Sequence, residues 1–170
     1  MAGNIEDLAQ RIQRMEDMEG VRQAFVDYLI HFDSRRYDLL ADVFTEDAIL
    51  EMVGLAPILR GDRKYNGRKA IMSDFFGSRV TKTARTGHFG TNLRVNLNDD
   101  EATSVAYFWE IIPGIDGKHH ILVGTYQHRM RRESDRWRIA HLRISVTFRS
   151  DLQATEIWGR PVGEVFSEPL

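Results

Sequence analysis

The first quarter of the chain has the hydrophobic spacing of helices. Between residues 5 and 44 the apolar side chains recur three and four positions apart, which is the period of helices with one buried face. Gly20 and the polar segment 33–36 interrupt this spacing. The pattern therefore predicts two helices, a short connection and a third short helix over 37–44.

The next part of the chain has the pattern of one strand, a loop and one more helix. Residues 48–53 have the composition of a first strand, and residues 54–65 are rich in Gly, Pro and charge, as loops are. Asn66 is expected to cap the N-terminus of a helix that ends near Gly77.

The second half of the chain changes to the pattern of strands. Four segments of about ten residues are rich in Val, Ile, Thr, Tyr and Phe, and turn-forming residues separate them. They cover residues 87–97, 102–112, 120–132 and 137–148. Helices followed by such a meander predict an α+β fold, in which three N-terminal helices pack on one face of a strongly curved, mixed or antiparallel sheet.

The length of 170 residues fits a single domain, 1–170. The segment 151–170 is polar, but it keeps more large apolar side chains than a free tail usually does. We expect it to pack across the sheet, to cover a cavity mouth as a lid, or to contact a neighbouring subunit.

Composition narrows the classes of function. The net charge of −2 gives no excess of basic residues to neutralise phosphates, so nucleic-acid binding is not expected. The absence of cysteine excludes disulfides, zinc–thiolate sites and thiol nucleophiles. No apolar run approaches the ~18 residues of a membrane span, and the first residues do not have the pattern of a signal peptide. We expect a cytoplasmic protein without a membrane partner.

Cofactor motifs are missing from the sequence as well. It has no Gly-rich phosphate loop, serine nucleophile elbow or nucleotide fingerprint. The spacing of its histidines matches neither a helical His-x-x-x-His pair nor a facial triad, so no metal site is expected. Any chemistry is left to His, Asp, Glu, Tyr and Arg without a cofactor.

Two residues far apart in the sequence carry the candidate chemistry. Asp33 lies at the edge of the apolar stripe of the second helix, which also contains Tyr28, and His88 opens a predicted strand. A neutral imidazole can accept a substrate proton near neutral pH, and a carboxylate on its other nitrogen fixes the tautomer. Alternatively, Asp33 only caps the end of its helix and His88 is structural. A proton-transfer site requires that the fold bring the two together.

Three further polar residues are candidates for binding a substrate. Asn92 follows His88 by four positions, on the same face of a regular strand, where it either contacts a substrate oxygen or anchors the fold. His128 and Arg143 lie on the last two strands, each on one face by alternation. One of these two faces is expected to line a cavity.

The order of elements, with Tyr-x-x-x-x-Asp at 28–33 and Gly-His-x-x-x-Asn at 87–92, resembles the SnoaL-like branch of the nuclear transport factor two-like superfamily. The resemblance is to the group around scytalone dehydratase, bile-acid dehydratase and hexachlorocyclohexane dehydrochlorinase. It implies a cone-shaped α+β barrel, with His88 as the catalytic histidine and Asp33 as its partner.

Other positions carry over from the resemblance less directly. Tyr28 matches a tyrosine of the dehydratases, where the dehydrochlorinase has a lysine, which disfavours halide elimination. Glu110 falls near an acidic cavity residue of the bile-acid dehydratase, with a register uncertain by one residue, which in a strand decides the face. Leu142 stands where the dehydrochlorinase keeps a cavity arginine.

Together these observations predict a cofactor-independent lyase of the dehydratase type that acts on a small hydrophobic, cyclic or aromatic molecule. His88, oriented by Asp33, is predicted to remove a proton, while Tyr28, with Glu110, assists the leaving group or polarises a carbonyl. An isomerase or a polyketide-type cyclase would use the same pair of residues.

A non-catalytic binding or assembly module is the alternative from another class. It predicts that Asp33 and His88 lie apart, or that His88 is walled off from any pocket. In either case we expect a homo-oligomer, formed through the outer face of the sheet and the tail, and the resemblance implies a dimer or trimer.

Overall fold

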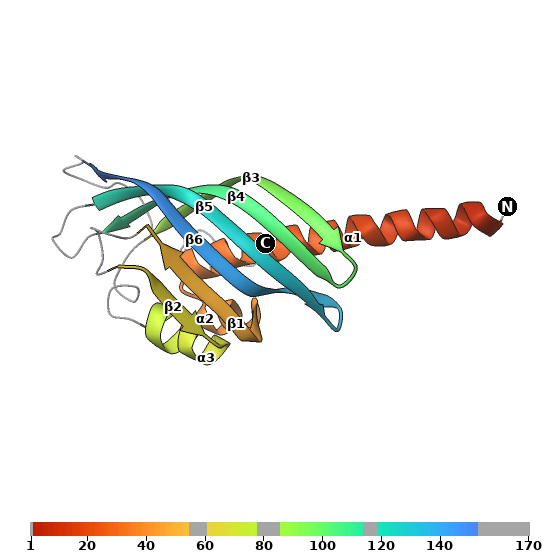
Figure 1. The fold of residues 1–170 in the computed structure, drawn as a ribbon, viewed down its shortest axis with the longest axis horizontal. Helices are drawn as coiled ribbons and strands as arrows, with labels where there is room; N and C mark the ends of the chain where they lie inside the picture. Colours follow the sequence, from red (N-terminus) through yellow and green to blue (C-terminus); the bar gives the residue numbers. More distant parts are fainter. Residues whose placement is uncertain (1, 55–60, 78–85, 114–118, 153–170) are drawn as a thin grey trace.

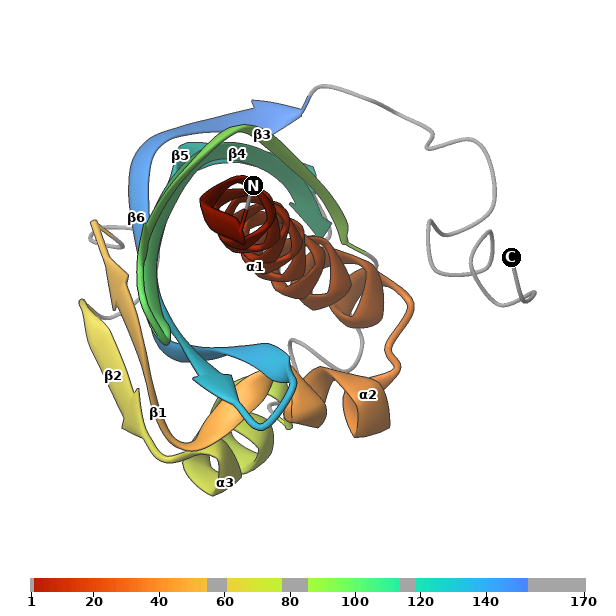
Figure 2. The ribbon, with the colours of Figure 1, turned by 90° about the vertical axis from the view of Figure 1, so that its right-hand side faces the viewer.

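The long first helix lies along the concave side of a curved sheet. The structure is a computed structural model that describes residues 2–54, 61–77, 86–113 and 119–152. The helix α1 (Ala2–Asp33) runs inside the arc of six strands and extends well beyond them at its N-terminal end (Figure 1, Figure 2). The remaining helical segments are short: α2 (Tyr37–Asp42), α3 (Arg68–Ala70) and one stretch of π-helix, η1 (Ile71–Phe76).

The sheet is mixed and does not close. Its strand order is β2-β1-β6-β5-β4-β3, so β2 and β3 are the two edges. Neighbouring strands are antiparallel except β1 and β6, which are parallel. The structure thus confirms the predicted α+β architecture and all four predicted strands of the second half. The six strands are β1 (Phe44–Val53), β2 (Arg63–Asn66), β3 (Gly87–Asn98), β4 (Glu101–Pro113), β5 (His119–Glu133) and β6 (Arg136–Leu152).

Alternation along the long strands defines the inner face of the sheet. In β4 the buried residues Ala102, Ser104, Ala106 and Phe108 alternate with exposed ones. The apolar face of α1 fills the concavity, and burial of its large side chains, at roughly 25 cal/mol per Å², is the main term that holds the helix there. The helix residues that are buried are Val21, Ala24, Phe25, Tyr28, Leu29 and Phe32.

Two glycines let α1 approach the sheet closely. A Cβ atom at Gly90 of β3 would lie 2.5 Å from Cζ of Phe25, and one at Gly20 would lie 2.6 Å from Cδ1 of Trp137. The predicted helix break at Gly20 is therefore wrong, because α1 continues through it. One glycine inside a helix costs only about 1 kcal/mol, and here it makes room for the indole ring.

The segment after β1 also differs from the prediction. The expected loop over 54–65 contains the start of β2, whose four residues pair with β1. Asn66 belongs to this strand and does not cap α3; Gly67 occupies the cap position with a φ of 82°, which glycine adopts without strain.

The predicted lid or subunit contact falls largely outside the described residues. Its first two residues, 151 and 152, continue β6, and residues 153–170 are not described. Within the described ranges, no helix is long and apolar enough to cross a membrane.

Candidate active site

Asp33 and His88 meet where the end of α1 passes the start of β3. Nδ1 of His88 lies 2.6 Å from Oδ1 of Asp33, and the backbone N–H of His88 donates to Oδ2 at 2.8 Å. The hydroxyl of Thr86 donates to Oδ1 at 2.9 Å. Because an ionised carboxylate only accepts hydrogen bonds, these contacts place a proton on Nδ1. Both side chains are almost fully buried, at 1% and 3% exposure for His88 and Asp33.

Glu110 contacts the other nitrogen of the same imidazole. It stands directly opposite His88 in the register of β3 with β4, and its Oε1 lies 3.2 Å from Nε2 of His88. The two side chains therefore share the inner face of the sheet, which resolves the register that the sequence left open. The imidazole lies between two carboxylates, and we call Asp33, His88 and Glu110 the charged row.

The two carboxylates decide the charge of the imidazole. Burial alone lowers the pKa of His88, but the charge of Glu110 and the hydrogen bond to Asp33 outweigh it and raise the pKa to about 10. His88 is therefore an imidazolium at neutral pH in the resting site. This differs from the neutral base that the sequence predicted, because Nε2 must give up its proton before it can accept one.

Tyr28 lies one and a half turns before Asp33 on α1 and is completely buried. Its hydroxyl makes no hydrogen bond of regular geometry with a described residue, although the hydroxyl of Tyr126 lies near enough to interact with it. Burial and the negative charges of Glu110 and Asp33 raise the pKa of the phenol above its ordinary value, so Tyr28 keeps its proton. An unpaired buried polar group costs about 1–3 kcal/mol, and a ligand oxygen that accepts from Tyr28 would remove this cost.

Aromatic side chains pack against the imidazole of the charged row. The ring of Phe32 lies 4.6 Å from the imidazole of His88, and Phe76 packs edge-on against Phe32 at 4.9 Å. These rings lower the local dielectric, which strengthens the electrostatic interactions within the row.

The atoms of the charged row that could bind a metal ion do not converge on one point. The two carboxylates contact opposite nitrogens of one ring, whereas metal ligands must surround a single ion. In the described part of the chain, no group of three or more His, Asp or Glu side chains has the arrangement of a metal site.

Asn92 does not share the face of His88, and that prediction is wrong. The pairing of β3 with β4 shifts by one residue between Thr91 and Arg94, which is a β-bulge. Asn92 lies in this bulge with a φ of 56° and an exposed side chain. The alternation that the sequence argument assumed is interrupted there.

His128 faces the interior but lies far from the charged row. Along the inner face of β4, Glu110 and the partner of His128, Ser104, are six residues apart, which is about 20 Å. Nδ1 of His128 lies 3.0 Å from the Ser104 hydroxyl, and burial lowers the pKa of the ring to about 3. His128 is a neutral histidine packed against the ring of Phe25.

Arg143 lies on the outer face of the sheet and is exposed between the buried Leu142 and Ile144. Of the two faces that the sequence left open, the interior one is that of His128. The prediction that Arg143 binds a substrate inside the sheet is therefore wrong. Leu142 is completely buried at the position where the resemblance leads one to expect an arginine.

Thr86 was not found from the sequence. It belongs to no motif, and the sequence shows only that a residue with a hydroxyl group lies two positions before His88. That hydroxyl becomes meaningful only when the fold places it beside Asp33.

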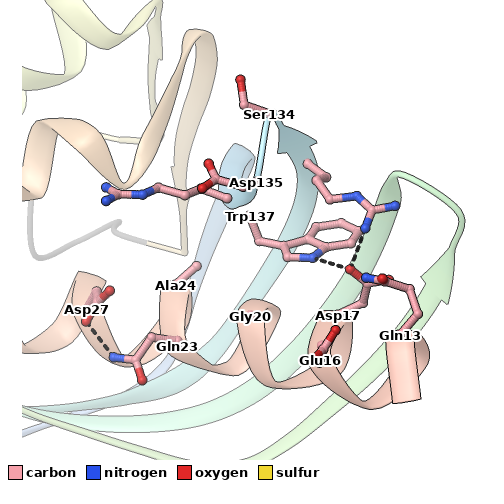
Figure 3. Close-up of a pocket in the computed structure, with 12 residues that line it drawn as sticks. Gln13, Glu16, Asp17, Gly20, Gln23, Ala24, Asp27, Ser134, Asp135 and Trp137 are labelled. Atoms are coloured by element: carbon pink, nitrogen blue, oxygen red, sulfur yellow. Dashed lines mark hydrogen bonds and ion pairs between the residues drawn. The ribbon is translucent and has the colours of Figure 1, made fainter. Parts of the chain in front are cut away.

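A separate hollow of about 660 Å³ lies between α1 and the tip of the β5–β6 hairpin (Figure 3). Asp17 accepts hydrogen bonds there from Arg132 at 2.8 Å and from the indole of Trp137 at 3.1 Å. The lining is largely polar and contains none of the predicted site residues.

The protein has a nuclear transport factor two-like fold, in which a curved mixed sheet wraps around one long helix. Its interior contains the buried, titratable side chains of the charged row. The chain belongs to the SnoaL-like domain family, whose pattern matches residues 13–143. A search of curated proteins finds no match.

Solved structures share this fold at low sequence identity. A type 2 hexachlorocyclohexane dehydrochlorinase is 19% identical with a TM-score of 0.75, over 89% of this chain and 98% of that chain. A protein of Novosphingobium aromaticivorans named after scytalone dehydratase is 19% identical with a TM-score of 0.70, over 83% and 91%. Another protein of that organism, named after an aromatic ring hydroxylase, is 25% identical with a TM-score of 0.70, over 81% and 94%.

Proposed function

We propose that the protein is a cofactor-independent lyase that removes water from a small hydrophobic, cyclic or aromatic substrate. The observation that carries the proposal is the buried imidazole of His88 between the carboxylates of Asp33 and Glu110. Titratable groups with strongly shifted pKa values are concentrated at functional sites, because catalytic acids and bases need pKa values matched to their task.

The number of protons in the charged row suits a dehydration. Nε2 of His88 and the carboxylate of Glu110 together hold one proton and one vacant acceptor. Dehydration takes one proton from carbon, forms a C=C bond as the C–O bond breaks, and gives one proton to the departing hydroxyl. The member of the pair without the proton accepts the carbon-bound one, and the other protonates the leaving oxygen. The proton then returns across the 3.2 Å gap.

Asp33 keeps the imidazole oriented throughout this exchange. It holds Nδ1 in its protonated form, so the reaction uses only Nε2, and it stabilises the positive charge on the ring. Thr86 and the backbone N–H of His88 fix the carboxylate itself. Asp33 is thus a positioning residue rather than a proton carrier.

Tyr28 supplies a neutral donor near the row. Its raised pKa keeps the phenol neutral, and its hydroxyl would bind a carbonyl or hydroxyl oxygen of the substrate. The surrounding rings favour an apolar molecule with few polar groups. An isomerase or cyclase would begin with the same proton removal and differ only in where the proton returns.

Proton removal from carbon is the step to test. The protein is incubated in D₂O with a panel of small cyclic and aromatic alcohols and ketones, and proton NMR follows loss of C–H signals and appearance of vinyl signals. We expect exchange or elimination that falls by about 10²–10⁴-fold in His88→Gln and Asp33→Asn, the usual range for acid–base groups.

A matched control comes from a second histidine–glutamate pair. Nε2 of His141 lies 3.3 Å from Oε2 of Glu51 on the outer side of the sheet, away from the charged row. His141→Gln should keep full activity. Full activity in His88→Gln would refute the proposal, and binding of panel members without exchange in the wild type would favour a binding module.

The predicted homo-oligomer stays a prediction. The outer face of the sheet carries exposed aromatic side chains, including a stacked pair, Phe89 and Trp109, with 3.9 Å between ring centroids. Tyr107 of β4 and Phe148 of β6 are also more than half exposed. Such a face is suited to contact with another subunit.

A further inference from the structure

The N-terminal half of α1 extends beyond the sheet (Figure 1). It carries apolar side chains that are exposed to solvent. Ile5, Leu8, Ile12 and Met15 are 72%, 53%, 48% and 70% exposed. A contiguous set of large exposed apolar side chains is unusual on an isolated protein and marks an interaction surface. We call these four residues the apolar stripe.

The helix is held firmly where it leaves the sheet. Asp17 accepts hydrogen bonds from Arg132 and from the indole N–H of Trp137, and Gly20 allows the indole to pack against the helix backbone (Figure 3). Among the described side chains of α1 before Asp17, none makes a hydrogen bond or ion pair to the sheet. A helix of this length is marginal in water without packing, so an apolar partner would stabilise it.

The spacing of the apolar stripe is that of a coiled coil. Steps of three, four and three residues place Ile5 and Ile12 at a positions and Leu8 and Met15 at d positions of two heptads. At 100° per residue, the stripe lies on roughly the opposite side of α1 from the face that the sheet buries. Two copies can therefore meet along their stripes while each sheet points away from the other.

We propose that the apolar stripe docks onto the same stripe of a second copy of this chain, as a short parallel two-stranded coil. Charge complementarity favours this occupant and this direction. In a parallel coil, the g residue of one helix faces the e residue of the next heptad in its partner, which pairs Arg11 with the partner's Glu16 twice. An antiparallel coil centred on the stripe would bring the two Arg11 side chains together. This surface is distinct from the outer face of the sheet.

The absence of cysteine makes a direct test simple. Ile12→Cys places a thiol in the seam of the proposed coil, where equivalent a positions face each other at a separation that a disulfide can bridge. Gln10→Cys is the matched control, because residue 10 is also exposed but lies about 180° around the helix from the stripe. Each full-length variant is oxidised at equal micromolar concentration, and disulfide-linked dimers are followed by non-reducing electrophoresis.

We expect Ile12→Cys to form linked dimers at least about tenfold faster than Gln10→Cys, since a tenfold preference is a modest 1.4 kcal/mol. Equal rates would overturn the proposal. Efficient linkage only between Leu8→Cys and Ile12→Cys chains would overturn the parallel direction, because it would require antiparallel helices.

Charge reversal tests the ion pair independently. Arg11→Glu and Glu16→Arg should each slow the cross-linking of Ile12→Cys, and the double reversal should restore it, since residues five apart on one helix do not face each other. A double variant that cross-links as slowly as the single variants would contradict the assigned pairing.

Discussion

The most informative single perturbation is Glu110→Gln, because Glu110 gives the largest contribution that raises the pKa of His88. The substitution keeps the shape and an acceptor oxygen but removes the charge 3.2 Å from Nε2. Two unit charges at this separation interact by roughly 5 kcal/mol at an effective dielectric of about 20. The carboxylate charge is spread over two oxygens and the side chain is 14% exposed, so we take about half of this interaction energy. The pKa of His88 should then fall by about 2, from about 10 to about 8.

Imidazole ¹⁵N NMR measures this pKa directly. The wild-type spectrum should show one histidine that stays cationic through neutral pH, and in Glu110→Gln that residue should lose its proton earlier. His88→Gln identifies the signal. If His88 in the wild type titrates near 6.5, or if Glu110→Gln leaves its pKa unchanged, the charged row does not form as described.

The same variant links the charge of His88 to stability. A histidine whose pKa is raised on folding stabilises the protein fully below its unfolded pKa of about 6.5, and the contribution is lost as pH rises through the folded pKa. The advantage of the wild type over Glu110→Gln in urea unfolding should therefore be about 3 kcal/mol larger at pH 6 than at pH 11. A difference that does not vary with pH would contradict this linkage.

Three further outcomes follow from particular contacts. Thr86→Val should leave Asp33 less firmly held and lower kcat by about tenfold or more with little change in KM, whereas a purely structural role would change stability alone. Gly20→Ala should destabilise by about 1 kcal/mol or more in urea unfolding, although alanine favours helices, because its Cβ would clash with Trp137; a more stable variant would contradict the packing. The ring of His128 should stay neutral down to about pH 3 in ¹⁵N NMR, and protonation near 6.5 would show that it is not buried.

The strands could be predicted because their alternation and turn residues are local signals. The break predicted at Gly20 failed because the role of this glycine is set by Trp137, more than a hundred residues away in the sequence. Local spacing cannot show such a contact. Asn66 failed for a similar reason, since its pairing with Ile49 of β1 outweighs its preference as a helix cap.

The candidate site was likewise only partly predictable from the sequence. The residues alone suggested that Asp33 and His88 form a proton-transfer pair, but only the resemblance placed them side by side, as the structure now does. The charge of His88 was beyond reach of the sequence, because it depends on Glu110 occupying the facing position of β4. Alternation alone did not decide whether Arg143 faces inward or outward. The burial of the neighbouring Leu142 shows that Arg143 lies on the outer face.

Asn92 shows how a residue predicted to bind a substrate can serve the site in another way. Near the β3–β4 hairpin, the inward residues of β3 are 93, 95 and 97, which are odd, whereas near the charged row they are 88 and 90, which are even. The extra residue of the bulge causes this change. If β3 kept all its residues but paired without a bulge, the hairpin register would place Ile111 opposite His88 and turn the imidazole to the outer face.

The bulge should therefore depend on a residue that tolerates a positive φ, as asparagine does. Asn92→Gly should keep the fold and the raised pKa of His88, because glycine adopts a φ of 56° without strain. Asn92→Val should cost about 1–3 kcal/mol, since a branched side chain is strained in this conformation. Deletion of Asn92 removes the extra residue together with the bulge, so Glu110 stays opposite His88 and the raised pKa of His88 should be kept. If the deletion variant folds and the pKa of His88 falls toward 6.5, the bulge must position the imidazole by more than the strand register.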